Sequence, residues 1–213
     1  MSTTAAPPSA KRRKRSPEEA REEALAAARE LLLTRGPKAV TLSSVGQAIG
    51  MTHANVIHHF GSAAELQSAL MGSMVADLTA ALEEAVAHVR SDSAAPRALV
   101  DIVFDAFDSG GAARLAAWMA LSQDIEHLEP VRDAVRSLVK AIEERAGVEG
   151  EAAHRRITSA VLLISLCGFA DSLIGAPLRG ILSRDAEATR RMMARLLPAF
   201  FEDDSAPTDE PGV

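Results

Sequence analysis

Three histidines, His53, His58 and His59, share one short segment and are the first side chains that could do chemistry. Imidazole rings bind transition metals, but neighbouring helical residues point about 100° apart, so His58 and His59 would chelate poorly. His53 lies one position off the four-residue spacing of a helical metal pair. We predict no metal site here.

The chain shows no phosphate-binding loop, nucleophile elbow or metal-ligand cluster. We therefore expect no catalytic residue, no cofactor and no enzymatic activity. Its single cysteine, Cys167, lies in an apolar run and is interpreted as a small buried hydrophobe. One cysteine excludes an intramolecular disulfide and fits a cytoplasmic protein.

The segment 41–60 has the pattern of a helix-turn-helix, in which two helices cross over a tight turn. Gly46 is the small residue that a close crossing needs, and Gly50 suits a turn with positive φ. The apolar anchors to a core are Val45, Ile49, Met51 and Val56. An ordinary helical hairpin is the alternative.

Capping residues place the helices of this region. Ser16, Pro17 and Glu19 predict a helix start with a capping box, and Gly36 predicts its end near Arg35. Thr41 and Thr52 are candidate caps of the two crossing helices. Ser62 opens a long helix to about residue 90, in which Gly72 marks a possible bend.

Residues 18–70 resemble the DNA-binding head of the TetR family of bacterial transcriptional regulators. Residues 41–52 are similar to the family's second helix and turn, and residues 56–62 to its signature of leucine, tyrosine, two histidines and phenylalanine before a serine cap. Glu65 and Leu66 match the start of its fourth helix.

The resemblance implies contacts with double-stranded operator DNA. Thr41 would meet a phosphate, and Ser43 and Ser44 would lie near the DNA. Asn55 could contact adenine, and His53 guanine or phosphate. The implied DNA-binding residues are Thr41, Ser43, Ser44, Thr52, His53, Ala54, Asn55, Ile57, His58 and His59.

Two positions depart from the family pattern. Ile57 replaces the usual tyrosine and Ala63 the usual lysine, so a hydroxyl and a cation are missing for phosphate contacts. We hypothesise that a basic arm compensates along the DNA backbone or in the minor groove, although it could be merely a solvated charge run. The arm consists of Lys11, Arg12, Arg13, Lys14 and Arg15.

The rest of the chain predicts an all-α fold, a three-helix head followed by a larger helical body. Further helices are expected at about 96–109, 111–124, 128–146, 150–174 and 186–202. We divide the chain into a disordered basic arm (1–15), a DNA-binding domain (16–62), a ligand-binding and dimerisation domain (63–203) and a disordered acidic tail (204–213), with a connecting helix at 62–90. The longest apolar run, 157–170, is short for a bilayer and is interpreted as a buried helix, with no membrane partner.

Charge is distributed unevenly along the chain. Residues 1–66 carry nine Lys and Arg against six Asp and Glu, a net +3, although the whole chain has −6. A basic head on an acidic body suits a polyanion-binding protein.

A homodimer is expected because operators of such heads are palindromic. Helices 150–174 and 186–202 could form a four-helix bundle with the partner, or only the body's own core. The interface candidates are Ala160, Ile164, Gly168, Leu197, Phe200 and Phe201.

The body is also expected to bind an unknown small apolar ligand, although the same apolar stripe could be plain core. The pocket candidates are Phe104, Phe107, Arg114, Trp118, Met119 and Gln123, with Leu99 and Val103 among further apolar lining residues. The leading interpretation is a repressor released by this ligand. An activator, a corepressor-dependent regulator and a helical interaction protein without DNA binding are the alternatives.

Overall fold

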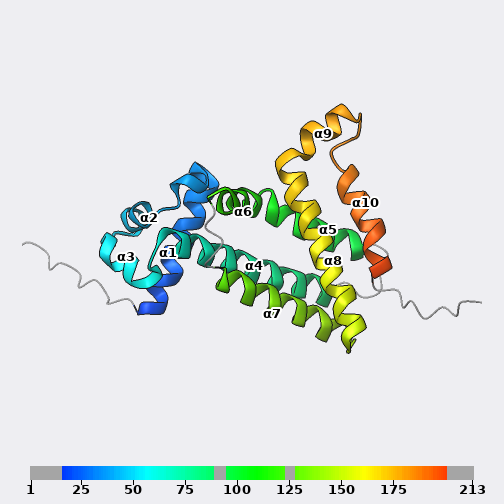
Figure 1. Ribbon diagram of the computed structural model, residues 1–213, viewed down its shortest axis with the longest axis horizontal. Helices are drawn as coiled ribbons and strands as arrows, with labels where there is room; N and C mark the ends of the chain where they lie inside the picture. Colours follow the sequence, from blue (N-terminus) through cyan, green and yellow to red (C-terminus); the bar gives the residue numbers. More distant parts are fainter. Residues whose placement is uncertain (1–15, 89–94, 123–127, 201–213) are drawn as a thin grey trace, which may run out of the picture.

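A computed structural model describes residues 16–88, 95–122 and 128–200, and this part of the chain is helical without a strand. The basic arm and the acidic tail predicted at the two ends lie outside the described residues. Figure 1 shows a head of three helices at one end and a larger helical body at the other. The all-α prediction is confirmed. The helices are α1 (Pro17–Arg35), α2 (Leu42–Ile49), α3 (His53–Phe60), α4 (Ala63–His88), α5 (Ala95–Phe107), α6 (Ala112–Leu121), α7 (Glu129–Ala146), α8 (Glu151–Ala170), α9 (Ala176–Ile181) and α10 (Ala188–Leu196).

The caps expected from the sequence form the helix starts. Ser16 Oγ accepts from the Glu19 amide at 3.1 Å while the Glu19 carboxylate accepts from the Ser16 amide at 2.8 Å, which completes the capping box. Ser62 Oγ accepts from the Glu65 amide at 3.1 Å at the start of α4. These bonds satisfy amides that a helix N-terminus leaves without a partner.

Helix α4 connects head and body, and α7 lies beside it along most of its length (Figure 1). The two helices run in the same direction: Gly72 meets Pro130 at the start of α7, and Leu82 and Ile142, further along the two helices, line the same cavity. A Cβ on Gly72 would lie 2.8 Å from the Pro130 carbonyl oxygen. Gly72 therefore permits a close approach of α4 and α7. The sequence analysis expected only a possible bend at this position.

The core of the head extends into the body. The buried residues of α1, α2 and α3 form one cluster with Leu66 and Leu70 of α4 and with Leu115 and Met119 of α6. Gln67 of α4 is also buried and donates to the Val40 carbonyl at 3.1 Å, directly before the cap of α2. The head is therefore packed onto α4 and α6.

The body ends differently from the expected helix at 150–174. Helix α8 passes through a π-helical turn, Asp171–Gly175, into α9, and Pro177, which has no amide donor, follows shortly after this turn. Asp171 holds this segment together by accepting bonds from Arg179 and from Thr189 near the start of α10.

Cys167 of α8 is half-buried, although the sequence analysis places it in the core. Burial, and after it the charge of Asp171, raise the pKa of the Cys167 thiol.

Candidate nucleic-acid interface

Helices α2 and α3 meet over the turn that the sequence predicts. Gly50 ends α2 in the left-handed conformation, with φ 67° and ψ 32°. A Cβ on Gly46 would lie 2.8 Å from the Met51 carbonyl oxygen and 3.3 Å from Val56 Cγ2. Val45, Gly46 and Val56 are buried at this crossing. The geometry is that of a helix-turn-helix.

Threonines cap both helices. Thr41 Oγ1 accepts from the Ser44 amide at 3.1 Å and donates to Ser44 Oγ at 2.9 Å. Thr52 Oγ1 accepts from the Asn55 amide at 3.3 Å. The amide ends of α2 and α3 carry partial positive charge, which favours an anion such as a phosphate.

The exposed surface of α3 holds the residues that the family resemblance implies for DNA contact. Val56 and Phe60 point into the core, and His59 is half-buried. The exposed side chains are Thr52, His53, Ala54, Asn55, Ile57 and His58. On α2, Ser43 is exposed while Thr41 and Ser44 are half-buried. The structure thus brings all ten implied residues to the two crossing helices.

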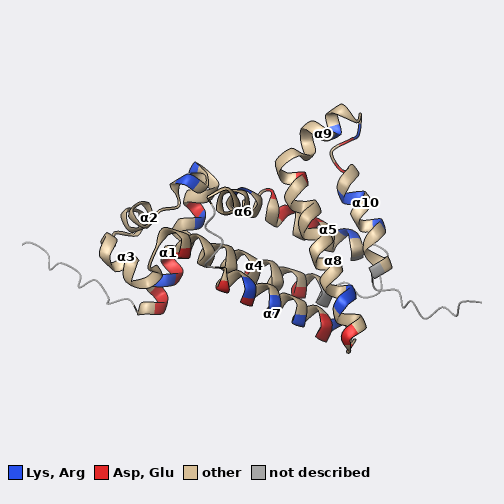
Figure 2. Cartoon of the chain, viewed as in Figure 1, with Lys and Arg blue, Asp and Glu red and all other residues tan. Residues whose placement is uncertain are grey.

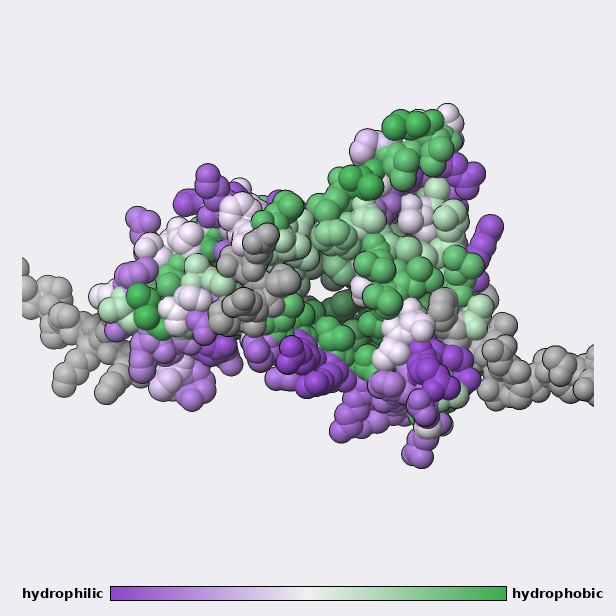
Figure 3. Space-filling model, in the orientation of Figure 1, coloured by the Kyte–Doolittle hydropathy of each residue, from purple (hydrophilic) through white to green (hydrophobic). Residues whose placement is uncertain are grey.

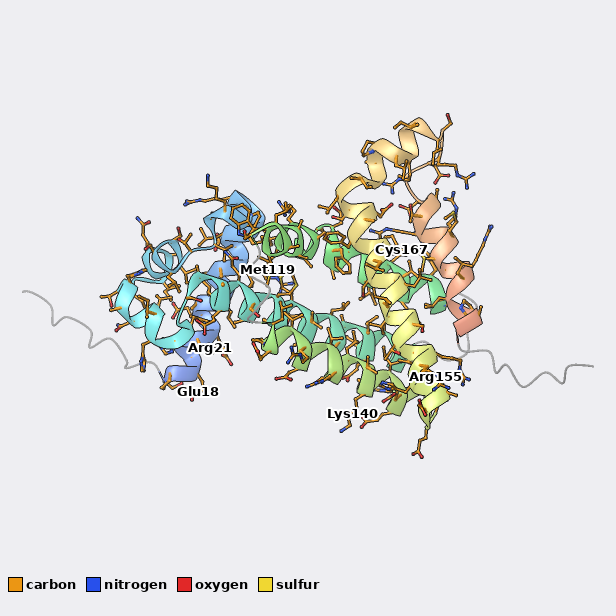
Figure 4. All side chains as sticks on the ribbon, viewed as in Figure 1. Glu18, Arg21, Met119, Lys140, Arg155 and Cys167 are labelled. Atoms are coloured by element: carbon orange, nitrogen blue, oxygen red, sulfur yellow. The ribbon has the colours of Figure 1, made fainter. Side chains whose placement is uncertain are left out.

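Two contacts of this region were missed by the sequence analysis. Ser43 Oγ lies 3.1 Å from His53 Nδ1 and joins the two crossing helices. Arg21 of α1 donates to the His59 carbonyl at 2.8 Å, and its guanidinium lies 4.6 Å from the centre of the Phe60 ring. Arg21 faces the end of α3 in Figure 4. The spacing of residues along the sequence could not predict these contacts, because each of them joins residues of different helices.

Charge is absent from the crossing helices themselves: residues 41–60 include no Lys, Arg, Asp or Glu, and α2 and α3 are tan throughout in Figure 2. Ala63, at the position of the usual lysine, is exposed at the start of α4. Arg29 pairs with Asp77 of α4. The basic arm, Lys11 to Arg15, lies outside the described residues.

A cavity of about 250 Å³ lies in the body between α4, α5, α7 and α8. Its wall is mostly apolar, with Glu83 and Arg145 as its charged residues. The lining side chains include Leu78, Leu82, Leu99, Val103, Leu138, Ile142, Ala160, Ile164 and Leu197.

Leu99 and Val103 line the cavity as expected, but the five pocket candidates within the described residues do not. Phe104 is buried in the core of the body, and Phe107 packs against both cores. Trp118 is half-buried and Met119 buried on α6, which packs on the head instead (Figure 4). Arg114 is exposed, and Gln123 lies outside the described residues. The cavity forms instead where α7 lies beside α4.

The residues suggested for dimerisation face inward. Ala160, Ile164 and Leu197 are buried and line the cavity. Gly168 faces the Phe107 ring, where a Cβ would lie 2.8 Å from Phe107 Cδ2. Within one chain these four residues are core, which was the other interpretation. Phe201 and the side chain of Phe200 lie outside the described residues.

The opposite face of this region is apolar and exposed. Figure 3 shows hydrophobic surface over α9 and along α8. The large exposed residues here are Leu162, Leu166, Leu173, Ile174, Leu178, Ile181, Leu182, Met192 and Leu196. We call this set the α8–α10 face. By length and composition the helical stretch Glu151–Ile181 is also apolar enough to cross a membrane, a test that core helices of soluble proteins pass as well.

Residues 24–70 match the family model described as bacterial regulatory proteins, tetR family. No curated protein sequence matches the chain. Among solved structures, a TetR-family transcriptional regulator from Streptomyces coelicolor is similar, with 17% identity and a TM-score of 0.60, over 87% of this chain and 97% of that one.

Two proteins named FadR are also similar in fold. The fatty acid degradation regulator FadR from Bacillus halodurans has 11% identity and a TM-score of 0.57, over 87% of this chain and 96% of that one. The repressor FadR from Thermus thermophilus, in complex with lauroyl-CoA, has 18% identity and a TM-score of 0.54, over 91% of this chain and all of that one.

Proposed function

From the premise that residues 24–70 form a TetR-family DNA-binding domain on a TetR-family regulator fold, we propose that this protein is a ligand-responsive repressor that binds a palindromic operator as a homodimer. The observation that carries the proposal is the crossing of α2 and α3, with six exposed side chains on α3 and its cap Thr52. The first turn of α3 enters the major groove, as in other helix-turn-helix proteins.

In this proposal several groups of the head and the arm each make a weak contact with a DNA phosphate. The capped N-terminus of α2 at Thr41 meets one phosphate through its amides. His58 and His59 lie next to the sugar-phosphate backbone of the DNA. Because residues 41–60 carry no cation, the arm from Lys11 to Arg15 supplies the phosphate contacts that Ile57 and Ala63 cannot make.

The α8–α10 face is the proposed dimer interface, in place of the inward residues suggested by the sequence. Contiguous exposed apolar surface of this kind marks an interaction site. A second copy brings an identical face, so a two-fold axis buries both at once. Two heads per dimer then double the DNA contacts that one head offers.

The cavity is the proposed ligand site. At about 250 Å³ it lies at the small end of ligand pockets and suits a slender apolar molecule. Arg145 at its exposed rim provides a cation for an anionic head group. The lauroyl-CoA bound to one relative of the same fold supports an acyl chain as the type of ligand.

Helix α4 is the proposed link from ligand to DNA. Leu78 and Leu82 line the cavity, and eleven and fifteen residues before them Gln67 donates to the Val40 carbonyl beside the cap of α2. A ligand that prefers one position of α4 shifts the spacing of the two heads, while a ligand with equal affinity for both positions releases nothing.

The test is binding of the full chain to the promoter beside its own coding sequence at two salt concentrations. We expect sequence-selective binding that weakens as salt rises and that lauroyl-CoA or lauric acid releases. The uncharged surface of α2 and α3 favours a second candidate, a helical interaction protein without DNA binding. Absence of any salt-sensitive, selective binding would support that candidate instead. Binding that only tightens with ligand would indicate a corepressor.

A further inference from the structure

Helix α3 lacks the groups that most often contact guanine. Arg or Lys donating to guanine O6 and N7 is the commonest specific contact in the major groove. Neither residue type occurs in residues 41–60. Arg21 approaches α3, but it is engaged with the His59 carbonyl and the Phe60 ring at the end away from the first turn.

Apolar side chains occupy the exposed surface instead. Ala54 and Ile57 are both exposed and lie three residues apart, which makes them neighbours on the helix surface. Val56 and Phe60 occupy the buried side. Asn55, next to Ala54 in the first turn, offers an amide for the adenine edge.

Ile57 stands out among the described residues of the head. Only Leu33 and Ile57 are large apolar residues exposed on α1, α2 or α3, at 39% and 41%. Leu33 lies beside Gly111 at the start of α6, on the side of the body. Of these two residues, Ile57 therefore is the one that lies on the exposed surface of α2 and α3, away from the cores of the head and the body.

We propose that Ala54 and Ile57 contact thymine methyl groups, so that the operator half-site is rich in A·T pairs where α3 enters the major groove. The C5-methyl of thymine is the apolar group that the major groove presents, and apolar side chains are its partners. Asn55 contacts an adjacent adenine. The inference rests on the proposed DNA-binding function and names the bases that this function recognises.

The experiment begins with selection of binding sites from random duplex DNA by the full chain. Each thymine of the selected half-site is then replaced by deoxyuridine, which removes only the methyl group. We expect an affinity loss of about fourfold at each contacted position. A 5-methylcytosine·guanine pair at the same position keeps the methyl and retains that part of the affinity.

Protein variants assign the methyl groups to side chains. Ile57→Ala is expected to abolish the effect of deoxyuridine at one position and to leave it intact at the others. Leu33→Ala is the matched control, since it removes an equally exposed apolar side chain away from α3, and it should keep every effect.

Two results are distinguishable. A selected site that is G·C-rich under α3, or one that is indifferent to deoxyuridine at every position, overturns the inference while DNA binding stands. Failure to select any sequence, with no salt-sensitive binding, counts against the proposed function itself.

Discussion

Ser43 of α2 and His53 of α3 lie 3.1 Å apart, Oγ to Nδ1, and this bond joins the two helices on their exposed side. It engages one ring nitrogen and so fixes the orientation in which the other reaches outward. Ser43 is thus a positioning residue for a proposed DNA contact.

Ser43→Ala is expected to weaken operator binding by about threefold to tenfold, the usual value of one hydrogen bond. His53→Ala should have a similar effect, and the double variant should be no weaker than the worse of the two. Fluorescence anisotropy with a labelled operator measures this, and an unchanged melting temperature shows that the head stays folded. Strictly additive losses would mean that the two residues act separately.

Deleting residues 1–15 should lower DNA affinity and flatten its salt dependence by at least about one unit of logarithmic slope. The arm carries five cations in a row, and each phosphate contact releases a counterion. Replacing Lys11 to Arg15 by glutamine keeps the chain length and serves as the control for length. Equal affinity and slope in all three proteins would show that the arm does not contact DNA.

Leu166→Asp should convert the proposed dimer into a monomer and lower operator affinity. Leu166 is 57% exposed on the α8–α10 face, where a partner would bury the aspartate carboxylate of the variant at high cost. Light scattering after size exclusion measures the mass. Val135→Asp on α7 is the matched control, at an exposed position outside this face. A wild-type monomer at micromolar concentration would contradict the interface.

Gly72→Ala should destabilise the protein by about 1–3 kcal/mol, the usual cost of overpacking. The new Cβ would lie 2.8 Å from the backbone oxygen of Pro130, so α4 and α7 must separate. Gly180→Ala is the control, because a Cβ there meets nothing within 4 Å in a helix. It should stabilise by up to about 1 kcal/mol through helix propensity. Thermal melts compare the two, and shifts of the same sign would refute the close approach.

Ala141→Phe should fill the cavity and abolish the ligand response while leaving operator binding intact. Ala141 lines the cavity from α7. Lauroyl-CoA at about 100 times its dissociation constant stabilises a binding protein by ~2.7 kcal/mol, which a thermal shift detects. We expect that shift in the wild type and in Ala80→Phe, an exposed position of α4, but not in Ala141→Phe. Equal shifts in all three would place the ligand elsewhere.

Local chemistry in the sequence was enough to predict the head. The capping box at Ser16 and Glu19, the left-handed Gly50 and the small Gly46 act within a few residues of one another, so their spacing carries the information. The body was predicted as helices, but its surfaces were not. The periodicity of residues 151–170 predicts an apolar helix. It does not predict which side of that helix packs against the other helices of the body.

The sequence by itself determined that this protein is all-α and carries a helix-turn-helix at residues 41–60, because caps, glycines and apolar spacing are local. Only the tertiary structure decided what the helices of the body do. Leu138 and Ile142 of α7 lie opposite Leu82 of α4 in the cavity wall, and α6 packs into the core of the head. On α8, Ala160 and Ile164 face inward while Leu162 and Leu166 are exposed, since long-range packing chooses among faces that are equally apolar in sequence.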